Sequence, residues 1–155
     1  MAIRQLRYSN DSILRKKCRE VMQVDDKIRQ ILDDMMETLH HTENGAALAA
    51  NQVGILKRLV VIDYCGYTLK LINPQIIESS GKQECIEGCL SFPNRIVKTI
   101  RPQKVIVRAL NENGEEITVA GLDEMAKCFC HELEHLDGEV FLDKAIEELT
   151  LEDFN

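Results

Sequence analysis

Apolar and polar residues alternate along this chain with two different periods, which predict helices in some segments and strands in others. From Asp25 to Leu39, apolar residues recur at spacings of three and four, the period of an amphipathic helix. The Asp25 carboxylate can cap the start of this helix, and Asn44-Gly45 offers a glycine to end it. We therefore expect an N-terminal amphipathic helix, preceded by an irregular segment with a helical turn near residues 12–17.

Strands are predicted in the middle of the chain, where short apolar or alternating runs are separated by turn residues. The expected strands are residues 59–62, 68–72, 75–78, 104–110 and 116–120, and a short amphipathic segment follows at 145–149. Asn73-Pro74 should break the second run from the third, and Asn113-Gly114 indicates a two-residue hairpin turn. Strands precede a C-terminal helical pattern without a repeating strand–helix–strand order, which predicts an α+β fold with antiparallel or mixed sheets.

The C-terminal helical pattern carries the most informative motif. Apolar residues stand at helical spacing at Leu122, Met125, Ala126, Phe129, Leu133 and Leu136, between Gly121 and Gly138. On a neighbouring face, His131, Glu132 and His135 form the sequence H-E-x-x-H. Residues four apart share one face of a helix, so the two imidazoles can bind one divalent metal, with Glu132 as a candidate general base. A catalytic site of this kind needs a third protein ligand and an open position for water.

Two earlier segments contain residues suited to complete such a site. Small residues dominate residues 45–54 and would let the backbone approach a ligand closely, while Gln52 adds an amide donor. A tight turn packed on the core would explain this segment equally well. Cys89 stands beside Gly88, and its thiolate is a strong soft donor for a metal. A structural cysteine in a buried strand is the alternative, and the spacing alone leaves both interpretations open.

Composition and charge narrow the function only slightly. With 155 residues, 45% hydrophobic and 29% charged, the chain is expected to form one domain over residues 1–155. Its net charge of −7 does not indicate a nucleic-acid site. The N-terminus lacks an apolar signal region and no apolar run is long enough for a membrane span, so we expect a cytoplasmic protein with reduced cysteines. Nothing in the sequence demands more than a monomer.

Taken together, three segments resemble the motifs of the peptide deformylase family. They are Gly45-Ala-Ala-Leu-Ala-Ala-Asn-Gln52, Glu87-Gly-Cys-Leu-Ser91 and Cys130-His-Glu-Leu-Glu-His135, in the family's order and at similar separations. The similarity extends from about Tyr8 to Lys144. Three motifs in order are far more specific than H-E-x-x-H alone. The resemblance implies an α+β fold whose sheets pack around a central helix carrying this last motif.

The resemblance also implies a metal site. It makes Cys89, His131 and His135 the ligands of one divalent cation and Glu132 the general base. The native metal would be Fe(II), with Zn(II), Ni(II) or Co(II) also able to occupy the site. The implied reaction removes the formyl group from N-terminal formylmethionine of newly synthesised, bacterial-type polypeptides and releases formate. The implied partners are therefore N-formylmethionyl nascent chains and, where these emerge, the ribosome.

Further residues of the site follow from the same resemblance. Gln52 and the backbone N–H of Leu90 would form the oxyanion site. The residues that would contact substrate are Ala46, Ala47, Gly88 and Cys128. Ala47 stands where the family usually has glycine, so this position is strained if its backbone requires a positive φ and is unstrained if only a small side chain is needed.

Other departures from the family pattern lie on the motif helix. Cys130 and Glu134 replace a glutamine and an aspartate, which can change how the ligands are oriented, and Arg101 is a candidate partner for Glu134. Glu124 and Lys127 stand where the family usually places apolar residues near the methionine pocket, which puts the side-chain preference in question. As an alternative, these two residues form an i,i+3 pair on the surface.

Two other functions are compatible with parts of the sequence. A zincin-like peptidase would take its third ligand downstream of the helix, where only glutamates such as Glu139, Glu147 and Glu148 are available. A non-catalytic relative would close the metal site with a fourth protein ligand, for which Cys85 and Cys130 are candidates. The first alternative predicts that a residue after the helix is the third metal ligand, and the second predicts a fourth protein ligand. A deformylase site has neither.

Overall fold

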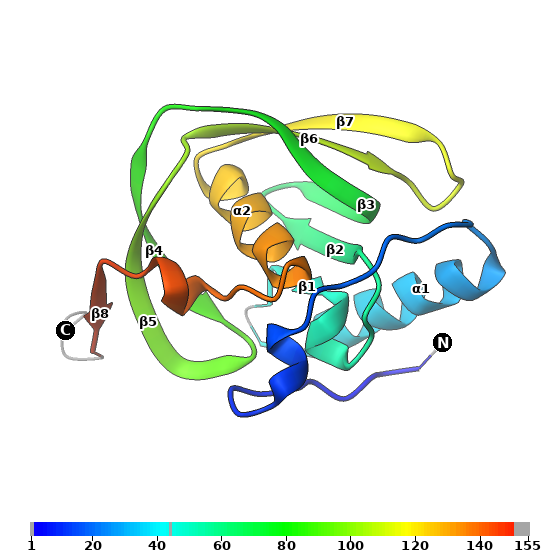
Figure 1. Cartoon of the computed structure of the whole chain (residues 1–155), viewed down its shortest axis with the longest axis horizontal. Coiled ribbons are helices and arrows are strands. Elements are labelled where there is room, and N and C mark those ends of the chain that lie inside the picture. The colour runs from blue at the N-terminus through cyan, green and yellow to red at the C-terminus, as the bar shows by residue number, and fades with distance from the viewer. Residues whose placement is uncertain (1, 44, 151–155) are drawn as a thin grey trace.

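The strands of this chain form two sheets, as seen in a computed structural model that describes residues 2–43 and 45–150 (Figure 1). The larger sheet has the order β1-β2-β3-β6-β7 and the smaller one the order β4-β5-β8. In chain order the elements are η1 (Ser12–Arg15), α1 (Asp26–His40), β1 (Ala47–Ala49), η2 (Ala50–Val53), β2 (Leu59–Tyr64), β3 (Tyr67–Ser80), β4 (Gln83–Cys89), β5 (Phe92–Arg101), β6 (Lys104–Leu110), β7 (Glu116–Leu122), α2 (Glu124–Leu136), η3 (Phe141–Lys144) and β8 (Glu147–Leu149). All neighbouring strands within the two sheets are antiparallel, which confirms the predicted α+β class.

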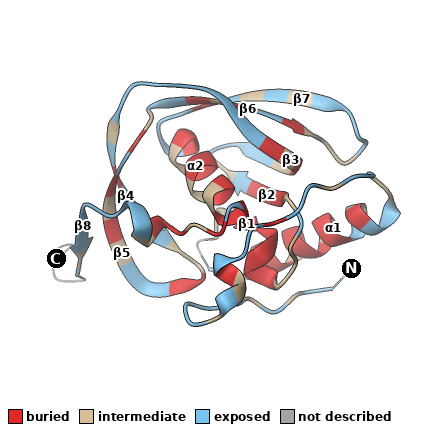
Figure 2. Ribbon diagram, in the orientation of Figure 1, coloured by how far each residue is buried: buried red, intermediate tan, exposed pale blue. Residues whose placement is uncertain are grey.

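The two helices cover opposite faces of the larger sheet. Val60 and Ile62 of β2 pack in one apolar cluster with α2, whereas Leu59 and Val61 pack in another with α1. Because β2 is covered on both faces, residues 59–62 are apolar at every position and are fully buried (Figure 2). The predicted strand at 59–62 is therefore correct, and its continuous apolar run reflects its place between two helices.

Helix α2 is held by apolar contacts on one side, and a glycine follows shortly after its last residue, Leu136. Phe129 and Leu136 are fully buried against the larger sheet. Gly138 has a φ of 76°, and a Cβ there would lie 2.5 Å from the Arg15 carbonyl oxygen, so a larger residue would be strained. Leu122, which was expected on this helix, instead ends β7 with 59% of its surface exposed.

The first helix begins where the sequence predicts but ends earlier. The Asp25 side chain accepts a hydrogen bond from the Ile28 N–H at 3.0 Å, which confirms the predicted cap. The helix ends at His40 rather than near Asn44-Gly45, of which Asn44 lies outside the described residues. The earlier end has a local cause, because the Thr42 hydroxyl donates to the carbonyl oxygen of Leu39 at 2.7 Å and satisfies part of the last turn.

The predicted break at Asn73-Pro74 is wrong, because β3 continues through it. Asn73 has a φ of 53°, and the pairing of β3 with β6 shifts register between Ile72 and Gln75. Such a bulge accommodates a proline, which cannot donate a backbone hydrogen bond to a regular ladder. The Asn73 side chain fixes the bulge by bonding both the N–H and the carbonyl of Val21, at 2.8 and 2.9 Å.

Strands β4 and β5 were not predicted, and they carry much of the candidate site. They form a hairpin joined by the turn Leu90-Ser91, so Cys89 is the last residue of β4. The amphipathic segment predicted at 145–149 contributes the short strand β8, which pairs with β5. This smaller sheet places Cys89 opposite helix α2.

Candidate active site

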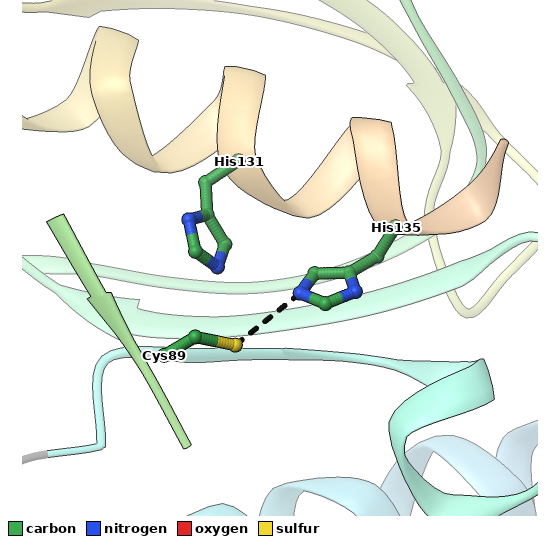
Figure 3. Close-up of side chains that lie close together, drawn as sticks. All are labelled: Cys89, His131 and His135. Carbon is green, nitrogen blue, oxygen red and sulfur yellow. Dashed lines mark hydrogen bonds between the residues drawn. The ribbon is translucent and has the colours of Figure 1, made fainter. Parts of the chain in front are cut away.

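Three side chains from two elements converge next to helix α2 (Figure 3). Their ligand atoms, from Cys89, His131 and His135, all lie within 4.8 Å of one another. The Cys89 sulfur lies 3.4 Å from Nε2 of His135. The two histidines share one face of α2 because they are four residues apart, and the end of β4 brings the sulfur to that face.

Glu87 fixes the orientation of His131. Its Oε1 atom lies 2.9 Å from Nδ1 of His131, which leaves Nε2 of that ring to face Cys89. Burial would raise the pKa of Glu87, but the hydrogen bonds from His131 and Arg101 outweigh burial and lower it to about 2. Glu87 is therefore ionised, and a carboxylate behind a histidine both orients the ring and increases its basicity.

A buried arginine joins this carboxylate to a second one. Arg101 binds Glu87 through Nε and Nη2 at 2.6 and 3.0 Å, and its Nη1 lies 2.6 Å from Glu134. The predicted pairing of Arg101 with Glu134 is thus confirmed. The Thr99 hydroxyl also donates to Glu87. The replacement of aspartate by glutamate at position 134 keeps a carboxylate within reach of the arginine.

The donor set fits a divalent transition metal. One thiolate and two imidazoles suit Zn(II), Fe(II), Ni(II) or Co(II) better than Mg(II) or Ca(II), which prefer oxygen ligands. Burial lowers the pKa of His135 and favours the neutral ring that a metal requires. For His131, burial acts in the same direction, but the hydrogen bonds to Cys89 and Glu87 raise its pKa. The negative charges of Cys89 and Glu87, which raise the pKa of His131, would also favour a bound cation.

Glu132 lies in the same cavity and is buried. Burial raises its pKa to about 7 from an ordinary value of 4.5, and its Oε2 atom has no hydrogen-bond partner among the described residues. A carboxyl group with a pKa near neutrality can both accept and return a proton at physiological pH. An unpaired buried oxygen beside three ligand atoms also fits a site that binds a cation and water.

The Gln52 side chain is held in one orientation. Its Oε1 atom accepts a hydrogen bond from the Ala49 N–H at 2.9 Å, so the amide nitrogen faces the opposite way. This nitrogen lies 3.1 Å from Oγ of Ser91 and 3.6 Å from the Cys89 sulfur. Gln52 therefore presents N–H donors to the space beside Cys89.

A cavity of about 570 Å³ brings most of the sequence-predicted site residues together. Those that line it are Ala46, Ala47, Gln52, Gly88, Cys89, Leu90, Cys128, His131 and Glu132. His135 is not among the residues that line this cavity, and it reaches the site through the 3.4 Å contact of its Nε2 with the Cys89 sulfur. Ala47 is not among the described residues with positive φ, so alanine is unstrained at this position.

Several neighbours of the site were not assigned from sequence. Glu87, Ser91 and Tyr64 line or contact the cavity, and Glu87 belongs to a recognised motif without having been given a role. One signal could have identified it. Residues two apart in a strand share a face, so a strand ending at Cys89 places Glu87 on the same side. The contact of Thr99 with Glu87 depends on the pairing of β4 with β5, which the sequence did not predict.

The geometry does not support the two alternative ligand sets. Among the residues described, the group that could hold a metal contains neither Cys85 nor Cys130. Glu147 and Glu148 lie in β8 and pair with Lys98 and Arg95. Downstream carboxylates thus make contacts elsewhere, and no fourth protein ligand joins the group within the described part of the chain.

The site combines a Cys/His/His group that can hold a divalent cation with a buried glutamate, and the fold is α+β. These features are those of a metal-dependent hydrolase. The sequence profile of the polypeptide deformylase family matches residues 3–150, and the chain belongs to this family. Removal of the formyl group from N-formylmethionyl peptides is the known function of the family. Among the described residues, no helix has the length and apolar character needed to cross a lipid bilayer.

Similar proteins cover nearly the whole chain. Peptide deformylase 2 of Clostridium acetobutylicum is 62% identical over 147 residues, which are 95% of this chain and 98% of that protein. Peptide deformylase of Acetivibrio thermocellus is 50% identical and covers 94% of this chain and 85% of its own length. The crystal structure of a peptide deformylase from Legionella pneumophila has a TM-score of 0.88 at 36% identity, covering 92% and 86% of the two chains. The Synechococcus elongatus enzyme, solved in complex with actinonin, has a TM-score of 0.87 at 38% identity, covering 92% and 78%.

Proposed function

We propose that Cys89, His131 and His135 hold the catalytic cation of this hydrolase and that Glu132 is its general base. The observation that carries this assignment is the convergence of three ligand atoms within 4.8 Å, in contact with a cavity that Glu132 also lines. A bound divalent cation supplies Lewis-acid chemistry, which activates water and polarises a carbonyl oxygen. The remaining steps fall to side chains and backbone groups of the chain itself.

Glu132 moves the proton during the reaction. It accepts a proton from the attacking water, whose oxygen adds to the formyl carbon, and it then donates this proton to the amine as the C–N bond breaks. The products are formate and a peptide with a free N-terminal amine. Gln52 and the Leu90 N–H donate hydrogen bonds to the formyl oxygen as negative charge develops on it. One such donor typically contributes about 10²- to 10³-fold in rate.

The native metal is Fe(II) in this proposal, and Zn(II), Ni(II) or Co(II) can replace it. The mixed sulfur and nitrogen donors support this group of metals without selecting one of them. A thiolate ligand also makes the site sensitive to oxidation, at the sulfur itself or at an Fe(II) centre. The metal should therefore be identified in protein that was purified without oxygen.

We also propose that residues 1–155 form a single domain organised around α2, with α1 as its amphipathic N-terminal helix. The substrates are formylmethionyl nascent chains, which places the enzyme in the cytoplasm of a bacterial-type cell and within reach of the ribosome. The chain acts as a monomer in this proposal, since Cys89, His131, His135 and Glu132 form the site without a residue from a second subunit.

Formate release tests the proposed function directly. Protein prepared without oxygen and loaded with Fe(II) or Ni(II) is incubated with formyl-Met-Ala-Ser, beside the variants Glu132→Ala and Gln52→Glu. We expect formate from the parent, almost none from Glu132→Ala, and about 10²- to 10³-fold less from Gln52→Glu, which keeps the acceptor for Ala49 but loses the donor. No formate from the parent, or equal formate from parent and Glu132→Ala, would refute the mechanism.

A further inference from the structure

We propose that Lys127 is a specificity-determining residue, through which the cavity also accepts N-formyl peptides whose first side chain ends in a neutral hydrogen-bond acceptor. Methionine sulfoxide and glutamine are side chains of this class. The inference rests on the proposed function, because it concerns which formyl peptides bind beside Glu132. It adds a substrate class that a purely apolar pocket would exclude.

The position of Lys127 on α2 places it next to the reacting groups. It precedes His131 by four residues, so the two side chains lie on the same face of the helix, one turn apart. Lys127 and its neighbour Cys128 both line the cavity that contains Cys89 and Glu132. Lys127 therefore stands on the cavity wall one helical turn before the proposed ligand His131, where a side chain of a bound formyl peptide can meet it.

The ammonium group of Lys127 contacts two elements of the structure. It lies 2.5 Å from a carboxylate oxygen of Glu124, one turn earlier in α2. It also donates to the Ile86 carbonyl oxygen of β4 at 3.2 Å. Only 18% of the Lys127 side chain is exposed, so its position is fixed by packing as well as by charge. The surface pairing expected for Glu124 and Lys127 does form, and Lys127 nevertheless lines the cavity.

These contacts leave hydrogen-bonding capacity for a ligand. An ammonium group has three N–H donors, and the structure gives Lys127 two acceptors among the described residues. Tyr64, which also lines the cavity, donates its hydroxyl proton to Glu124 at 3.1 Å and retains its own acceptor capacity. The wall of the cavity at this point is polar and pre-organised.

The charges around Lys127 select a neutral acceptor over a carboxylate. Glu124 already neutralises the ammonium, and Glu87, which also lines the cavity, is paired with Arg101. This wall therefore has no unpaired positive charge to offset the desolvation of a substrate carboxylate, whereas a sulfoxide or amide oxygen adds no charge. The sulfoxide oxygen is a stronger acceptor than a thioether sulfur, which makes methionine sulfoxide the most informative probe.

The test compares two peptides on the Ni(II)-loaded holoenzyme. Formate release is measured for formyl-Met-Ala-Ser and for the same peptide with methionine sulfoxide, in the parent, Lys127→Met and Lys127→Arg. Lys127→Met keeps an unbranched, flexible side chain of nearly the same length and removes the donor. We expect it to lower kcat/KM for the sulfoxide peptide at least tenfold relative to the methionine peptide, mainly through KM, and Lys127→Arg to retain the parent ratio.

Lys70→Met is the matched control, because Lys70 pairs with Asp33 at 2.7 Å outside the cavity lining. Its ratio should equal that of the parent, and thermal unfolding of each variant verifies that the fold is retained. Two results would overturn this inference alone. One is no turnover of the sulfoxide peptide by the parent. The other is a ratio of kcat/KM for the sulfoxide peptide to kcat/KM for the methionine peptide that Lys127→Met lowers less than tenfold, relative to the parent and to Lys127→Arg. Absence of formate from every peptide would instead overturn the proposed function.

Discussion

The carboxylate oxygen Oε1 of Glu87, in strand β4, lies 2.9 Å from the ring nitrogen Nδ1 of His131, in helix α2. This contact links the smaller sheet to α2 and fixes which nitrogen of His131 can face Cys89. Its strength depends on ionisation of Glu87, which Arg101 maintains. The orientation of one proposed ligand is therefore set by a residue that touches neither the cation nor the formyl group in our mechanism.

Replacement of Glu87 by glutamine should weaken metal binding. The variant keeps the size of the side chain but removes the negative charge behind His131, and outer contacts of this kind typically change metal affinity or activity by about 10- to 100-fold. We expect the Ni(II) dissociation constant, measured by competition with a chelator, to rise within this range. An unchanged dissociation constant would show that the 2.9 Å contact only packs the histidine.

Removal of the Arg101 guanidinium should destabilise the fold. Arg101→Met leaves Glu87 and Glu134 without their cation in a largely buried position, and removal of one partner of a buried pair costs about 3–5 kcal/mol. Urea unfolding of the metal-free protein measures this change. Arg108→Met is the control, because Arg108 and Glu116 are both exposed and 3.4 Å apart, and such pairs contribute at most about 1 kcal/mol. Equal effects of the two substitutions would contradict the prediction.

Burial of Glu132 should make the stability of the metal-free protein depend on pH. Because the pKa rises to about 7 in the folded state from an ordinary 4.5, the folded protein binds the proton more tightly than the unfolded chain. The resulting stabilisation is fully present below pH 4.5 and is lost as the pH rises through about 7. Its magnitude is on the order of 3 kcal/mol.

Glu132→Gln isolates this contribution, because glutamine does not titrate and the other ionisable groups stay in place. The difference in free energy of unfolding between parent and variant should change by this amount between pH 4 and pH 8, with the parent losing stability relative to the variant. Urea unfolding at both pH values provides the measurement. A difference that is constant with pH would mean that Glu132 titrates normally in the folded protein.

Local parts of the fold and site followed from the sequence, whereas contacts between distant segments did not. The cap at Asp25 depends on neighbouring residues and is present, as is the hairpin of β6 and β7. Its connection spans residues 111–115 rather than the expected two residues, because the Asn111 side chain accepts from the N–H groups of Asn113 and Glu115 and closes a longer turn. The break expected at Asn73-Pro74 was wrong because contacts of Asn73 with Val21, 52 residues away, stabilise a bulge. Strands β4 and β5 were missed, because their polar inward residues, including Glu87 and Thr99, conceal the apolar alternation that identifies a strand.

What the sequence alone determined is the pairing of His131 with His135 beside Glu132, because helical geometry puts residues four apart on one face. The three motifs also carried the resemblance to the deformylase family. Only the tertiary structure decided that Cys89, 46 residues from His135, lies 3.4 Å from it, and that Lys127 lines the cavity and contacts the Ile86 carbonyl oxygen of β4. Local rules act within a few residues, whereas these contacts require the smaller sheet to pack against α2 in one particular register.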